Sequence, residues 1–214
     1  ICARWPRPGA PTRWPRCAAP RPDAAGFARL WLMWALMAAA MMAPTALPAF
    51  ATYEDLGRAT PVRPLALMAG YLAVWLGFAL VAAAAQMALV GAGLLTPLGD
   101  SRSRGLDAAL LAGAGLYQFS PLKQACLARC RQPLSFFMQH WDEGALRNGL
   151  RLGLVCLGCC WALMALAFVG GMSSLGFMAL ATVVMAAEKL QAAAWITRPL
   201  GAALIFAAIA ALIV

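Results

Sequence analysis

Six long apolar runs restrict this chain to very few folds. They cover residues 27–50, 64–95, 106–119, 145–169, 172–190 and 195–214. A membrane-spanning helix needs about 20 apolar residues, and in lipid only helices and closed barrels satisfy every backbone hydrogen bond. Barrel strands alternate apolar and polar residues, whereas these runs are continuous. We therefore predict an all-α fold, a polytopic membrane helix bundle with about six hydrophobic helices.

The composition supports membrane insertion and indicates two parts of the chain. Hydrophobic residues make up 63% and charged residues 12%, against about 45–50% and about 25% in soluble domains. Residues 1–26 are rich in Pro, Ala and Arg, without apolar periodicity. We predict a disordered basic tail over 1–26, which leaves Cys2 and Cys17 outside any site, and a transmembrane bundle over 27–214. The tail fits the positive-inside rule, and we expect no nucleic-acid partner.

The third apolar run, 106–119, is too short for a standard span, and two topologies stay open. With six spans, the basic residues divide eight against nine across the membrane. With a re-entrant third run they divide fifteen against two. The positive-inside rule favours the second arrangement.

Five of the seven cysteines fall in two groups at helical spacing. The groups are Cys126 with Cys130, and Cys156 with Cys159 and Cys160. Spacings of three and four residues place side chains on one helix face. Clustered thiols can bind a soft metal ion, for which we rank univalent copper first and zinc second. They can also exchange disulfide bonds. The alternative is that these small residues, like Gly153 and Gly158, let helices pack closely. If the two groups share one ion, they must converge in space. We also expect Cys126 and Cys130 to lie on a helix that begins near Pro121, because proline is well placed in a first helical turn.

Other residues could complete a site. Met33, Met37 and Met41 recur every four residues in the first run, so Met37 and Met41 are candidate thioether ligands, although methionine is often only packing. His140, the only histidine, could join if its loop folds over the cysteines. Glu188 and Lys189 at the end of the fifth run suggest an interfacial anchor, and Gln86 an interhelical hydrogen bond. One histidine cannot build a catalytic zinc site with three histidine ligands, so metallohydrolase chemistry is disfavoured. We expect that the protein is not an enzyme.

The chain resembles a bacterial family of predicted metal-binding integral membrane proteins, often labelled copper chaperones. The resemblance rests on segments 41–44, 70–78, 115–123, 126–131, 140–141, 156–161, 168–171 and 188–190. Two positions depart from the family pattern. Leu152-Gly-Leu-Val155 stands where the family has His-Gly-Leu-Tyr, which removes a candidate ligand, and Ala43 stands where a Leu usually precedes the proline. The resemblance implies metal handling in the bacterial inner membrane.

Together these features predict a protein of the lipid bilayer that binds copper(I) through the five clustered cysteines, helped by Met37 and Met41. It would deliver, store or insert copper, with a copper-dependent enzyme or a soluble copper carrier as partner. The alternatives are a membrane thiol-disulfide oxidoreductase, or an accessory subunit of a membrane complex with no chemistry of its own.

Overall fold

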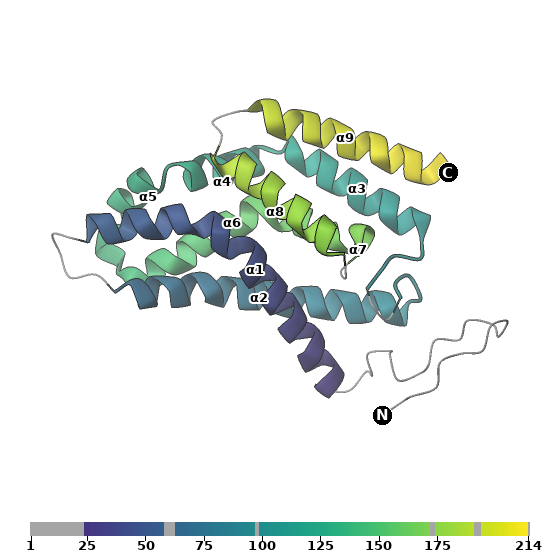
Figure 1. Ribbon diagram of the computed structural model, residues 1–214, viewed down its shortest axis with the longest axis horizontal. Coiled ribbons are helices and arrows are strands. Elements are labelled where there is room, and N and C mark those ends of the chain that lie inside the picture. The colour runs from purple at the N-terminus through teal and green to yellow at the C-terminus, as the bar shows by residue number, and fades with distance from the viewer. Residues whose placement is uncertain (1–23, 58–62, 97–98, 172–173, 191–193, 214) are drawn as a thin grey trace.

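The computed structural model describes residues 24–57, 63–96, 99–171, 174–190 and 194–213, so the tail predicted over 1–26 lies mostly outside them. The described residues form nine α-helices and one short 3-10 helix (Figure 1). A single isolated bridge between Leu95 and Ser101 is the β-structure found there, which confirms the all-α prediction. The elements are α1 Ala24–Leu56, α2 Pro64–Gly91, α3 Arg104–Gln118, α4 Pro121–Arg131, α5 Pro133–His140, η1 Trp141–Glu143, α6 Ala145–Ala165, α7 Ala167–Gly170, α8 Leu175–Leu190 and α9 Ala194–Ile213.

In the part of the chain that the structure describes, four helical stretches are long and apolar enough to cross a membrane, fewer than the six predicted. They are α1, α2, α6 continued through α7, and α9. Helix α3 has 15 residues and α8 has 16. At 1.5 Å per residue these reach only about 22 and about 24 Å, less than the ~30 Å hydrocarbon core. The third run is therefore short, as expected, and the fifth is shorter than predicted.

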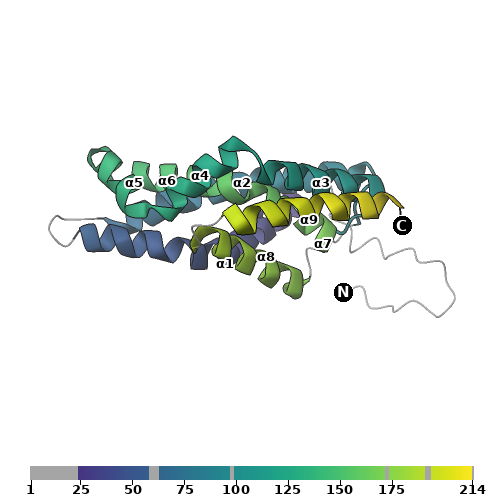
Figure 2. The same cartoon turned by 90° about the horizontal axis from the view of Figure 1, so that it is seen from above.

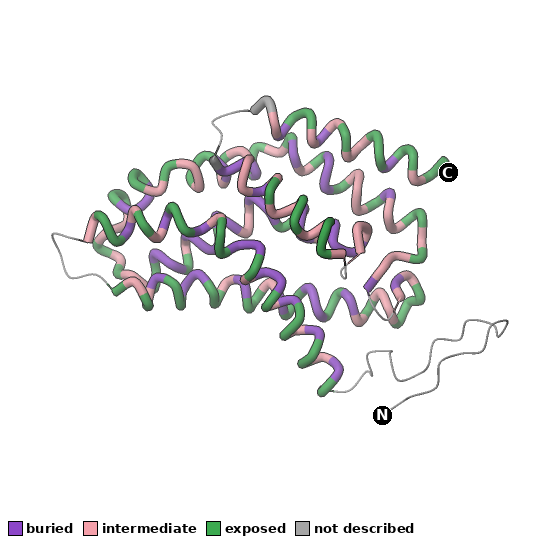
Figure 3. The backbone as a smooth tube through the Cα atoms, in the orientation of Figure 1, coloured by how far each residue is buried: buried purple, intermediate pink, exposed green. Residues whose placement is uncertain are grey.

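Helix α6 lies at the centre of the bundle and packs closely against α2. A Cβ atom added at Gly149 would collide with the backbone carbonyl of Leu67, and one added at Gly70 would collide with that of Leu146. Such contacts between glycines and backbone are typical of membrane helix pairs. Buried residues line the inner faces of α1, α2 and α6, whereas α9 is largely exposed (Figure 3). Trp34 of α1 donates a hydrogen bond to Gln86 of α2 at 2.8 Å, which confirms the interhelical bond predicted for Gln86.

Helix α1 bends in its middle (Figure 1). Pro44 and Pro48 lie inside it, and proline lacks the N–H that would bond to the carbonyl four residues earlier, which is a common cause of kinks. The hydroxyl of Thr45 donates to the carbonyl of Met42 at 2.9 Å at this bend. Met41 and Met42 precede the first proline, so the bend helps to set where their side chains point.

Helix α4 starts where the sequence predicts. Pro121 occupies its first turn, and the hydroxyl of Ser120 accepts a hydrogen bond from the backbone N–H of Lys123 at 3.1 Å. A hydroxyl cap followed by proline is a strong start signal for a helix. Helices α4, α5 and α6 lie on one side of the bundle, and α1 and α8 on the other (Figure 2). The candidate site lies between these two sides.

Candidate metal centre

Three thiols of α6 form the base of the candidate site. The Sγ atoms of Cys156, Cys159 and Cys160 lie within 4.8 Å of one another, and all three residues are buried. The thiols of Cys159 and Cys160 donate to the backbone carbonyl of Cys156 at 3.0 and 2.9 Å. This arrangement follows from the sequence, because residues three and four positions apart share a helix face.

Helix α4 brings the second cysteine group to the first. The Sγ atoms of Cys130 and Cys159 lie 3.9 Å apart, which confirms the predicted convergence of the two groups. Cys126 lies one turn earlier on α4, where its sulfur sits against Gly158 of α6. A Cβ atom at Gly158 would lie 2.6 Å from that sulfur, so the glycine permits the close approach of the two helices.

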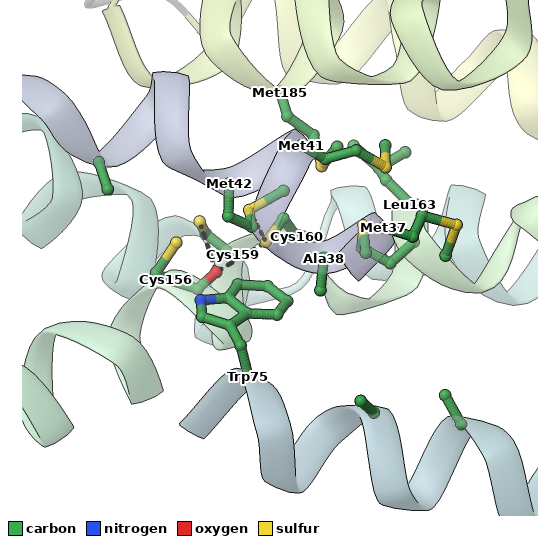
Figure 4. Packing of buried hydrophobic residues seen from close by; sticks show 14 of the residues in the cluster. Met37, Ala38, Met41, Met42, Trp75, Cys156, Cys159, Cys160, Leu163 and Met185 are labelled. Carbon is green, nitrogen blue, oxygen red and sulfur yellow. Dashed lines mark hydrogen bonds between the residues drawn. The ribbon is translucent and has the colours of Figure 1, made fainter. Parts of the chain in front are cut away.

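A thioether completes the sulfur cluster, but it comes from a methionine that sequence reasoning did not select. The Sδ atom of Met42 lies 3.7 Å from the Sγ atom of Cys160. Met37 and Met41 are buried nearby in the same core (Figure 4), but their sulfurs do not accept a hydrogen bond from a cysteine thiol among the described residues. The sequence signal for Met42 was the Met-Met pair two residues before Pro44, which lies outside the four-residue spacing of Met33, Met37 and Met41.

Cys156 is surrounded by polar groups that the sequence analysis did not associate with the site. The ammonium of Lys189 and the hydroxyl of Tyr71 each lie 3.1 Å from its Sγ atom. Lys189 also donates to the hydroxyl of Thr45 at 2.7 Å. Four helices, α1, α2, α6 and α8, therefore meet around one sulfur atom.

Glu188 is not an interfacial anchor, and that interpretation was wrong. Its side chain is 2% exposed and pairs with Lys123 of α4, itself 1% exposed, at 2.9 Å. The guanidinium of Arg131 donates to the backbone carbonyl of Glu188 at 2.9 and 2.6 Å. We call these three residues, Lys123, Arg131 and Glu188, the α4–α8 clamp. The clamp holds the helix that carries Cys126 and Cys130 in place.

His140 is in contact with Phe136 rather than with a cysteine. Its Nδ1 atom lies 2.9 Å from the carbonyl of Phe136, and the two rings are 5.2 Å apart. The histidine lines an open cleft of about 510 Å³ together with Arg129 and Arg151. Among the described residues, no cysteine lines that cleft, so the structure does not bring His140 to the sulfur cluster.

The environment of α4 favours the protonated form of its two thiols. Burial, followed by repulsion from Cys159, raises the pKa of Cys126, and Arg129 opposes this only in part. Hydrogen bonds to Cys156 and Cys159, followed by burial, raise the pKa of Cys130 well above its usual range. A metal would therefore have to displace protons from these sulfurs when it binds.

The donor set fits a soft univalent ion. Four cysteine sulfurs and one thioether lie together, and neither histidine nor carboxylate belongs to this group among the described residues. Thiolate and thioether ligands select copper(I), whereas zinc sites of mixed type use histidine or carboxylate. Three thiols on one helix face also differ from the two Cys-x-x-Cys pairs of a zinc knuckle.

The family model described as PpoB2: Copper chaperone matches residues 31–211. No curated protein and no solved structure matches the chain.

Proposed function

Because the chain belongs to the PpoB2 copper chaperone family, we propose that it binds copper(I) inside the membrane and passes it to another protein. The proposed ligands are drawn from Cys130, Cys156, Cys159 and Cys160, with the thioether of Met42. The observation that carries the proposal is the 3.9 Å separation of Cys130 and Cys159, which joins cysteines far apart in the sequence. Two sulfur atoms that bind one ion lie roughly 4 Å apart, because each metal–sulfur bond is only about 2.3 Å long.

The other candidate ligands, Cys126, Met37, Met41 and His140, would have peripheral roles. Cys126 lies one turn from Cys130 and faces Gly158, and Met37 and Met41 are buried in the core around Cys160. They are candidates for holding the ion briefly on its way in or out. His140 would take part only after α5 moves toward the cysteines, through Nε2, because Nδ1 already bonds to a carbonyl.

We propose that the protein works in a bacterial inner membrane as a multi-pass protein. Four helical stretches long and apolar enough to span support this, as do the many exposed large apolar side chains on the outer faces of α1, α2 and α9. Such a surface is unfavourable in water and suits lipid. The receiver or donor of copper would be a copper-dependent enzyme or a soluble copper carrier.

The copper-to-protein ratio of the purified, reduced protein tests the proposal directly. Under anaerobic conditions we expect one tightly bound copper(I) per chain, and none when Cys159 and Cys160 are both replaced by Ser. Cys17→Ser, and deletion of residues 1–26, are the controls and should keep full copper content. A wild-type protein without copper, or a double variant that retains it, would contradict the proposal.

A thiol-disulfide oxidoreductase is the second candidate, and the same pair of sulfurs supports it. A disulfide bond between Cys130 and Cys159 requires a sulfur separation near 2 Å, and the thiols already lie 3.9 Å apart. An oxidant-dependent shift in electrophoretic mobility that is lost in Cys130→Ser, in a protein that binds no copper, would favour this function.

A further inference from the structure

Lys189 places a positive charge inside the sulfur cluster. It lies in the last turn of α8, is only 9% exposed, and contacts three other residues through its Nζ atom. These contacts are Thr45 Oγ1 at 2.7 Å, Cys156 Sγ at 3.1 Å and Met42 Sδ at 4.0 Å. Two of the three are sulfur atoms of the proposed copper site.

This ammonium has no carboxylate partner among the described residues. The neighbouring carboxylate, that of Glu188, is bound by Lys123 at 2.9 and 3.1 Å. Adjacent residues on a helix point in different directions, so Glu188 faces α4 while Lys189 faces α1 and α6. A buried charge is costly unless an opposite charge compensates it. The groups beside Lys189 that can become anionic are the cysteine thiols.

We propose that Lys189 is the charge-balancing residue that fits this site to a univalent metal held by two thiolates. The inference rests on the proposed copper(I) function and adds how the site chooses between metals. Each thiol that binds the ion loses its proton to solvent and becomes a thiolate. One copper(I) ion and two thiolates then carry a net charge of minus one, which the ammonium neutralises. With zinc(II), the same two thiolates and the ammonium leave a net charge of plus one.

Charge matters here because the site is buried. Electrostatic imbalance is weakly screened in a protein interior, so an uncompensated unit charge disfavours binding far more than it would in water. Removing the charge of Lys189 should therefore act in opposite directions on the two metals. It leaves the bis-thiolate copper(I) complex negative and makes the bis-thiolate zinc(II) complex neutral.

The test compares metal affinities of the full-length protein, reduced and in detergent without oxygen. The variants are Lys189→Met, which removes the charge, and Lys189→Arg, which keeps it. Arg129→Met is the matched control, because it removes an exposed cation beside Cys130. Copper(I) affinity is measured by competition with bathocuproine disulfonate, and zinc(II) affinity by competition with a chromophoric chelator. Circular dichroism verifies that each variant is folded, and Lys189→Gln replaces Lys189→Met if the latter is unfolded.

We expect the ratio of copper(I) to zinc(II) affinity to fall by at least about tenfold in Lys189→Met, equivalent to about 1.4 kcal/mol. Lys189→Arg and Arg129→Met should keep the wild-type ratio. X-ray absorption of the copper-loaded wild type should show copper bound by sulfur ligands. An unchanged ratio in a folded, charge-free variant overturns the role of Lys189 and leaves copper binding intact. A wild-type protein that binds no copper(I) overturns the proposed function and this inference together.

Discussion

Replacing Lys123 with Met should destabilise the protein strongly, because it removes one half of the buried pair in the α4–α8 clamp. Lys123 and Glu188 are 1% and 2% exposed, and the ammonium contacts both carboxylate oxygens, at 2.9 and 3.1 Å. Arg131 binds the backbone carbonyl of Glu188, so it does not replace the lost ammonium. Breaking a buried pair in this way costs about 3–5 kcal/mol. For a chain of this size that lowers Tm by roughly 6–20 °C.

Replacing both residues should restore most of the loss. In Lys123→Met combined with Glu188→Met, no buried charge remains, and apolar replacements of a buried pair are often neutral or stabilising. Arg147→Met is the control, because the pair of Arg147 with Glu143 is largely exposed and should contribute less than about 1 kcal/mol. Thermal unfolding in detergent, followed by circular dichroism, measures all three. A single variant as stable as wild type, or a double variant as unstable as the single one, would refute the reasoning.

Three further predictions concern the sulfur cluster. Gly158→Ala places a methyl group 2.6 Å from the sulfur of Cys126, and this overpacking should lower the free energy of unfolding by about 1–3 kcal/mol. Gly113→Ala is the control in the same melting assay, because a Cβ atom there meets nothing within 4 Å. Met42→Leu keeps the packing volume and should weaken copper(I) binding by about tenfold with little change in Tm, whereas Met41→Leu should leave chelator competition unchanged. Burial raises the pKa of Cys126, so the folded state holds that proton more tightly than the unfolded chain. Stability should therefore be complete below the usual thiol range and fall as the pH rises through that range and above it. Cys126→Ser should reduce that slope in pH-dependent melting curves, and an unchanged slope would count against it.

The helices and the meeting of the cysteine groups could be predicted because they depend on local spacing. Pro121 after Ser120 marks the start of α4, and residues 156, 159 and 160 share one face of any α-helix. Because the cysteines of each group lie on one face of their helix, an ion that both groups bind requires the two helix faces to meet. The structure confirms that geometry between Cys130 and Cys159.

The thioether and the buried charges could not be predicted because they depend on how helices bend and pack. The four-residue spacing of Met33, Met37 and Met41 assumes a straight helix, but α1 contains Pro44 and Pro48 and bends, and Met42 contacts Cys160 instead. In the sequence, Glu188 and Lys189 at the end of an apolar run suggest an interfacial anchor. In the fold each takes a partner from another helix, and Lys123 is 65 positions away from Glu188. Contacts between residues so far apart in the sequence leave no periodic pattern from which they could be predicted.

The α4–α8 clamp would also determine when the proposed copper site is completed during protein synthesis. The chain leaves the ribosome from its N-terminus, so Cys130 and the three α6 cysteines emerge before Glu188 does. Helix α4 has only 11 residues and carries Lys123, Arg129 and Arg131, which gives it little tendency to enter lipid before its partner exists. We therefore expect the α4 thiols to stay apart from those of α6 in the nascent chain. The proposed donor set would form only on the finished bundle, so a half-made protein would not trap metal there.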